Sequence, residues 1–208
     1  MENIIVAITG ASGVIYGRRL LQVLCDKSYS IHLSISESAA KVIESELNLS
    51  LDLKDFDVSK FIGRKSPCVT YHHVSDIAAP ISSGKFKSKA MIIVPCSMNT
   101  LCSVASGIAS NLIQRAASVT LKEGRKLVVV PRETPLTSIH LESMLKLSRA
   151  QVCILPAMPG YYYLPKTIDD QVDFIVGKIL DYIGIEYSPY TKKGYGELDF
   201  LSSELMTT

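Results

Sequence analysis

The stretch Ile4-Ile-Val-Ala-Ile-Thr-Gly-Ala-Ser-Gly13 decides the fold of this chain, because an unbroken apolar run ends there in a turn of small residues. A strand with one solvated face alternates apolar and polar residues, whereas a continuous run is typical of a strand buried on both faces of a parallel sheet. Four similar runs follow, at residues 31–35, 90–94, 126–130 and 152–155. The chain is therefore expected to build a parallel sheet.

Segments with helical spacing of apolar residues lie between most of these runs, at residues 15–24, 39–47, 112–121 and 139–147. The clearest helix begins after Thr167, which forms a capping box with Asp170, and ends at Gly184. This alternation predicts an α/β fold, a doubly wound, mainly parallel sheet with helices on both faces in a three-layer sandwich. We expect a single domain over residues 1–186 and a C-terminal tail over residues 187–208.

The composition excludes several classes of protein. The chain has 208 residues, 47% of them hydrophobic, which is too apolar for an intrinsically disordered chain. The 22 Lys and Arg nearly balance the 20 Asp and Glu, so the strongly positive electrostatic field that is typical of nucleic-acid-binding proteins is not expected. The longest apolar runs are far shorter than the roughly 20 residues of a membrane helix. Five cysteines without a CxxC motif, and a start without a basic leader, indicate reduced thiols and a cytoplasmic protein.

The residues that follow the strands form the candidate site, because open α/β sheets bind ligands beyond the carboxyl ends of their strands. Small residues, hydroxyl groups and prolines follow five of the predicted strands, at residues 10–13, 36–37, 95–100, 131–135 and 156–163. Turns of this kind present backbone amides and helix N-termini to an anion. The pattern therefore favours a phosphorylated ligand.

The first of these turns superficially resembles a dinucleotide-binding fingerprint. It departs from G-x-G-x-x-G because Ser12 stands where the second glycine belongs. The next strand ends in Ser36 and lacks the acidic residue that binds a ribose in NAD-dependent proteins. A mononucleotide such as FMN, with its phosphate in the turn of residues 10–13, fits better than NAD.

Two pairs of charged residues are candidates for chemistry. Arg132 and Glu133 follow a buried strand and could clamp a phosphate and move a proton within one site, although a structural ion pair is the alternative. Arg115 and Lys122 lie seven residues apart on one predicted helix, which alone would indicate a solvated basic stripe.

Cys96 is interpreted as a buried thiol. No Cys/His cluster has the spacing of a metal site, so no metal is predicted.

Six segments together resemble the UbiX/Pad family of flavin prenyltransferases, within the homo-oligomeric flavin-containing Cys decarboxylase superfamily. They are residues 9–13, 95–100, 111–135, 139–142, 155–160 and 167–170, and the resemblance extends over residues 3–186. It implies a flavodoxin-like core, a homo-oligomer of dodecamer size with FMN bound between its subunits, and no metal. The implied reaction joins the dimethylallyl group of dimethylallyl phosphate to reduced FMN, and the prenylated FMN then passes to a UbiD-type decarboxylase.

The resemblance also implies roles for individual residues. FMN would contact Gly10, Ala11, Ser12, Ser36, Ser97, Met98, Asn99, Thr100 and Arg132. Dimethylallyl phosphate would be held by Tyr162 and by Lys178, which stands where many members have Arg. The catalytic candidates are Ser12, Glu46, Glu133, Lys122 and Arg115, with the two glutamates as acid/base groups. Ile77 stands where some members have Trp, so an aliphatic wall is expected at the prenyl site.

Two other functions stay open at this point. An FMN-dependent cysteine decarboxylase of the same superfamily would rely on a catalytic His, and no His of this chain matches that position. A plain FMN-binding carrier would need neither the pair Arg132 and Glu133 nor the pair Tyr162 and Lys178.

Overall fold

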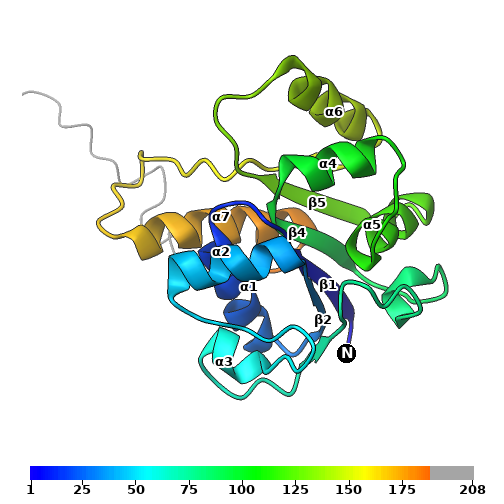
Figure 1. Cartoon of the computed structure of the whole chain (residues 1–208). Coiled ribbons are helices and arrows are strands. Elements are labelled where there is room, and N and C mark those ends of the chain that lie inside the picture. The colour runs from blue at the N-terminus through cyan, green and yellow to red at the C-terminus, as the bar shows by residue number, and fades with distance from the viewer. Residues whose placement is uncertain (188–208) are drawn as a thin grey trace, which may run out of the picture. The chain divides into compact units, whose positions relative to one another are not determined.

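The computed structural model describes residues 1–187, and these residues form a six-stranded sheet (Figure 1). The strands are β1 (Asn3–Ile8), β2 (Ser30–Ile35), β3 (Val69–Tyr71), β4 (Ala90–Cys96), β5 (Lys126–Pro131) and β6 (Cys153–Ile154). Their order is β3-β2-β1-β4-β5-β6, and every pair is parallel. The direction of winding reverses between β1 and β4, and such a switch point is where open α/β sheets bind their ligands.

The two central strands explain the continuous apolar runs of the sequence. Every residue of β4 is buried, and in β1 only Asn3 is not fully buried. A strand in the middle of a sheet with helices on both faces has no solvated side, so both sets of alternate residues must be apolar. The predicted strand class is therefore confirmed.

Helices connect the strands and cover both faces of the sheet. They are α1 (Val14–Cys25), α2 (Glu37–Leu47), α3 (Val58–Ile62), α4 (Met98–Ala105), α5 (Leu112–Lys122) and α6 (Ser138–Arg149). A further helix, α7 (Ile168–Ile183), follows the last strand in the chain. One apolar cluster joins strand residues such as Ile5 and Met91 to Leu101 of α4 and Ile113 of α5. Helix α1 contacts β1, β2 and β4, and the reversal of winding places it on the opposite face. These layers confirm the predicted doubly wound α/β fold.

Two helices were not predicted. Helix α4 begins at Met98, inside the segment that was interpreted as a turn, and its eight residues are too few to establish a period. Helix α3 has only five residues, lies between α2 and β3, and buries Phe61 and Ile62. Both helices depend on packing more than on a sequence pattern.

Residue contacts divide the chain into two compact units, the first from Met1 to Ala157 and the second from Met158 onward. The first unit holds the whole sheet with α1 to α6. In the second, Thr167 and Asp170 form the predicted capping box of α7, and Gly184 ends the helix with φ 74°. The single domain over residues 1–186 stays a prediction, and the predicted tail, except for Tyr187, lies outside the described residues. None of the described helices could cross a membrane.

Candidate active site

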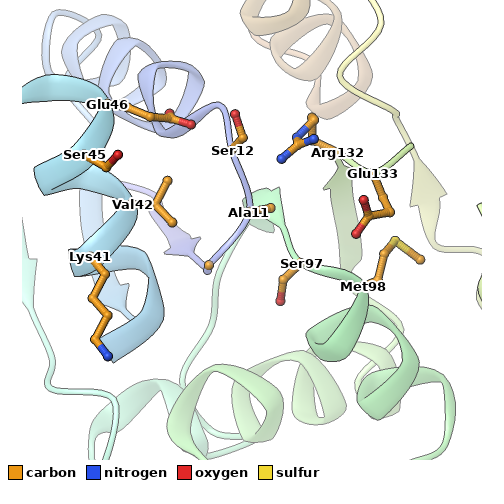
Figure 2. A pocket seen from close by; sticks show the side chains of 11 residues that line it. Ala11, Ser12, Lys41, Val42, Ser45, Glu46, Ser97, Met98, Arg132 and Glu133 are labelled. Carbon is orange, nitrogen blue, oxygen red and sulfur yellow. The ribbon is translucent and has the colours of Figure 1, made fainter. Parts of the chain in front are cut away.

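A cavity of about 400 Å³ lies at the carboxyl ends of β1, β4 and β5, at the switch point of the sheet (Figure 2). It is lined by the loop after β1, one side of α2, the start of α4 and the residues after β5. The lining residues are Gly10, Ala11, Ser12, Lys41, Val42, Ser45, Glu46, Ser97, Met98, Arg132 and Glu133. This volume lies within the range of about 300–1,000 Å³ that small-molecule sites occupy.

The turn after β1 is closed by a carboxylate from α2. Glu46 Oε2 accepts hydrogen bonds from the amides of Gly13 at 3.0 Å and Val14 at 3.1 Å. Gly13 has φ 99°, a left-handed conformation that glycine adopts without strain, and its position lets the chain turn into α1. A carboxylate at this helix N-terminus takes the place that a phosphate occupies in dinucleotide-binding proteins. These two amides are therefore already bonded to Glu46, and the phosphate position in the turn of residues 10–13 stays a prediction.

Gly10 and Ser36 meet through a third small residue, Ser38. A side chain at Gly10 would collide with the Ser38 side chain, which explains why only glycine fits there. The Ser36 hydroxyl lies 3.0 Å from the Ser38 hydroxyl and accepts a hydrogen bond from the Ala39 amide at the start of α2. Ser36 thus adjoins the cavity wall without lining it.

The junction of β4 and α4 holds the opposite side of the cavity. The Ser97 amide donates to Thr9 Oγ1 at 2.7 Å, and this hydroxyl donates to the carbonyl of Pro95 at 3.0 Å, which ties the ends of β1 and β4 together. Ser97 Oγ caps α4 by accepting from the Thr100 amide. The amides of Met98 and Asn99, in the first turn of α4, have no acceptor within the helix and are available to a ligand.

Arg132 and Glu133 extend from the end of β5 into the cavity. Arg132 Nε is buried and has no hydrogen-bond partner among the described residues. An unpaired buried donor is costly, so this atom marks a position for an acceptor from a ligand. Glu133 accepts the amide of its neighbour Thr134 at 3.0 Å. Arg132 and Glu133 form no ion pair among the described contacts, which argues against the structural ion-pair interpretation.

Three residues of α2 line the cavity although the sequence did not indicate them: Lys41, Val42 and Ser45. Lys41 and Ser45 are four residues apart, so they share one face of the helix. Helical periodicity counted from Glu46 would have indicated this face of α2 if the contact of Glu46 with the start of α1 had been known.

Two of the predicted catalytic residues do not line this cavity within one chain. Arg115 is exposed on α5. Lys122 ends α5, and its Nζ lies 3.2 Å from Glu123 Oε1. Because β5 starts four residues later, the end of α5 lies at the amino edge of the sheet, opposite the cavity.

The two residues predicted to bind the prenyl phosphate are neighbours within the second unit. The Tyr162 ring packs edge-on against Phe174, with centroids 5.8 Å apart, and Lys178 Nζ lies 5.6 Å from the centroid of the same ring. Gly160 makes this possible, since a Cβ there would come within 2.7 Å of the Tyr162 ring. Both side chains thus pack against the Phe174 ring, and a phenol and an ammonium group are each donors that suit an anionic ligand.

Cys96 is completely buried, and this burial raises the pKa of its thiol, so it is no nucleophile at neutral pH. Within the part of the chain that the structure describes, no group of three His, Cys, Asp or Glu side chains could hold a metal ion.

Comparisons with known proteins agree along the whole described chain. A family model described as Flavoprotein matches residues 1–180. The flavin prenyltransferase UbiX of Halalkalibacterium halodurans is 50% identical over 189 residues, which cover 91% of this chain and 92% of that protein. The UbiX of Pseudomonas aeruginosa is 43% identical over 98% of both chains.

Solved structures point in the same direction. A dodecameric FMN-dependent UbiX-like decarboxylase from Escherichia coli O157:H7 superposes with a TM-score of 0.80 at 42% identity, over 90% of this chain and 96% of that one. A UbiX protein in complex with FMN and dimethylallyl pyrophosphate gives 0.79 at 39% identity, over 89% and 93% of the two chains. The peptidyl-cysteine decarboxylase EpiD, at 17% identity and a TM-score of 0.54, shares the fold alone. This chain belongs to the flavoprotein family and, within it, to the UbiX flavin prenyltransferases.

Proposed function

We propose that this protein is a flavin prenyltransferase that joins the dimethylallyl group of dimethylallyl phosphate to reduced FMN and releases phosphate. The observation that carries the proposal is the cavity at the switch point, where Ser12, Arg132 and Glu133 surround one space of about 400 Å³. The chain that builds this cavity is 50% identical to a flavin prenyltransferase.

The residues of the cavity fit a flavin mononucleotide. Residues 10–12 carry no large side chain, so a flat ring system can approach the backbone of this loop. The unpaired Nε of Arg132 and the free amides of Met98 and Asn99 would donate hydrogen bonds to its oxygens, with Ser36, Ser97 and Thr100 contributing hydroxyl groups nearby. Reduced FMN, when bound, supplies the nucleophilic nitrogen and the ring carbon that accept the prenyl group.

The other residues serve the leaving group and the protons. When the allylic C–O bond breaks, its electron pair stays on the phosphate, and the cations of Lys178, Arg115 and Lys122 with the Tyr162 hydroxyl would stabilise that charge. A ring of cations is sufficient for a monophosphate, so no metal is needed. Glu133 would take up the proton that the acceptor loses, and the Ser12 hydroxyl would orient the acceptor nitrogen.

A second copy of the chain is proposed to complete the site, because Arg115 and Lys122 do not line the cavity of their own chain. The related UbiX-like protein of E. coli is dodecameric. Helix α6 exposes the large apolar side chains of Ile139, Leu141 and Leu145 with 66%, 53% and 52% of their surface accessible, and association would cover such side chains. We therefore propose a homo-oligomer, of dodecamer size, with sites at the subunit junctions.

Mixed oligomers test this shared site. Co-expressed Lys122→Ala and Glu133→Gln chains with different tags should regain part of the activity that each variant lacks alone, because some junctions then combine an intact Lys122 with an intact Glu133. Oligomers of either variant alone are the controls. Mixed oligomers as inactive as both controls would show that the two residues act in the same chain.

The product is proposed to serve a UbiD-type decarboxylase in the cytoplasm, on the strength of the family resemblance. Pull-down or transfer assays with such a decarboxylase would test this step separately from the prenyl transfer.

The proposed reaction is tested by incubating the protein with reduced FMN and dimethylallyl phosphate in the absence of oxygen. The molecular mass of the flavin is then measured by mass spectrometry. The flavin should gain one prenyl unit while phosphate is released. A cysteine decarboxylase or a plain FMN carrier would leave the flavin mass unchanged.

A further inference from the structure

Two cysteines from distant parts of the chain meet at the amino edge of the sheet, away from the cavity. Cys25 ends α1, and Cys68 directly precedes β3. They are 43 positions apart in the sequence, yet their Sγ atoms lie 2.8 Å from each other. All five cysteines are free, and no other pair of them makes such a sulfur–sulfur contact in the described part of the chain.

We propose that Cys25 and Cys68 form a modification site, a dithiol that a small-molecule disulfide oxidises to an intramolecular disulfide. One protein thiolate attacks a sulfur of the oxidant, which forms a mixed disulfide and releases one small thiol. The second protein thiolate then attacks the mixed disulfide and releases the second small thiol. The two protein sulfurs are oxidised, the oxidant is reduced to two thiols, and the two protein protons end on these products.

The geometry favours closure of this bond. The two sulfurs need to approach by only about 0.8 Å to reach the S–S length of about 2.05 Å. Their backbones are already fixed in place, since the Cys68 carbonyl accepts a hydrogen bond of 2.8 Å from the Ile31 amide at the start of β2. Closing the bond therefore requires no rearrangement of the sheet.

The surroundings leave the pair within reach of a small oxidant. Both cysteines are half-buried, and the adjacent ion pair of Arg64 and Asp26 lies at the surface. Burial, with a further contribution from Cys68, raises the pKa of the Cys25 thiol to about 12, although Arg64 opposes the shift. Whichever cysteine attacks first, the other lies close enough to resolve the mixed disulfide.

The disulfide would tie α1 to the edge of the sheet. Strand β3 has three residues and pairs only with β2, so it is held by few contacts. A bond that closes so long a loop restricts the unfolded chain, and a rise of Tm by about 5 °C or more is expected. FMN binding should not change, because the cavity lies at the opposite edge.

The test treats the reduced full-length protein with oxidised glutathione, removes the oxidant and measures the intact mass, the free thiols and Tm. The protein should lose the mass of two hydrogen atoms and two of its five thiols. A peptide that links Cys25 to Cys68 should appear, and Tm should rise.

Three variants control the experiment. Cys68→Ser and Cys25→Ser should each abolish the mass loss and the rise of Tm, while Cys153→Ser, which removes another half-buried thiol, should leave both intact. If a variant fails to fold, the peptide map of the unmodified protein decides alone. Five remaining thiols, a persistent mixed disulfide or a link between other cysteines would overturn the proposal.

Discussion

Glu46 and Glu133 are the two carboxylates of the cavity, and the protein holds them in different ways (Figure 2). Glu46 bridges two elements, because it reaches from α2 to the amides of Gly13 and Val14 at the positive end of α1. Among the described residues, Glu133 accepts a hydrogen bond from a single amide, that of its own neighbour Thr134. The two groups lie on opposite walls of the same space.

The difference separates the two tasks of the site. A carboxylate fixed by amides of another helix keeps the loop of residues 10–13 in one conformation, and that loop carries Ser12. A carboxylate that is held only locally can turn toward a substrate and exchange a proton. We therefore propose that Glu46 positions the loop and that Glu133 transfers the proton; the acid/base role that the family resemblance implies for Glu46 stays a prediction.

The largest expected effect comes from Glu133→Gln. Loss of the proton acceptor should lower turnover by about 10²- to 10⁴-fold, whereas FMN affinity and Tm should stay unchanged because Glu133 supports no other element. Steady-state kinetics, a flavin titration and thermal unfolding measure the three quantities. Undiminished turnover would remove Glu133 from the mechanism.

Glu46→Ala should act on stability and FMN affinity instead. Loss of a charged acceptor at the start of α1 should lower the free energy of unfolding by about 1–2 kcal/mol. Glu46→Gln should lie between the unmodified protein and Glu46→Ala, because its amide oxygen still accepts hydrogen bonds. Glu44→Ala, an exposed change on the same helix, is the matched control. Equal Tm values for Glu46→Ala and Glu44→Ala would contradict the positioning role.

Lys41→Ala sharpens the comparison on the wall that carries Glu46. Lys41 lines the cavity and makes no ion pair among the described contacts, so its charge is available to the FMN phosphate. The affinity for FMN should fall by roughly threefold at low salt, as for an exposed charge pair, and the affinity for riboflavin should not change. The same loss in Lys65→Ala, on the far edge of the sheet, would mean a non-specific charge effect.

The pH dependence of stability should come from neither Glu46 nor Glu133 but from a histidine pair, in which His32 Nδ1 lies 2.9 Å from His72 Nε2. Burial lowers the pKa of both residues below the ordinary 6.5. The unfolded chain therefore binds more protons just below pH 6.5, so their contribution to stability is complete above pH 6.5 and declines as the pH falls below it. Tm measured against pH should show a smaller slope in His72→Asn, because only His32 then contributes; an unchanged slope would assign the effect elsewhere.

Much of the fold could be predicted because its signals are local. Apolar runs predicted β1, β2, β4 and β5 within one or two residues at each end. In β1, β4 and β5 burial on both faces leaves no alternation, whereas β2 alternates with His32 and Ser34. Helix α4 was missed because its start at Met98 follows a proline and serine segment that is equally typical of a turn.

The residues of the site likewise divide into those that have a local sequence signal and those that do not. Gly10, Ser97, Arg132 and Glu133 directly follow strands, so the carboxyl-edge rule sufficed to place them together. Lys41 could not be placed, because its helix face is decided by the packing of α2. The bond from Glu46 to Gly13 spans 33 positions, a tertiary contact with no local signal. The position that we propose for Lys122, beside the cavity of a neighbouring subunit, would require a second chain, which the sequence of one chain does not reveal.

The most direct test follows a single turnover in protein loaded with reduced FMN, after addition of dimethylallyl phosphate without oxygen. Mass spectrometry of the flavin and a phosphate assay are run in parallel for the unmodified protein and for Glu133→Gln. The account predicts one phosphate released for each flavin that gains a prenyl unit, and neither event at a comparable rate in the variant. A folded, FMN-loaded protein whose flavin mass does not change would contradict it.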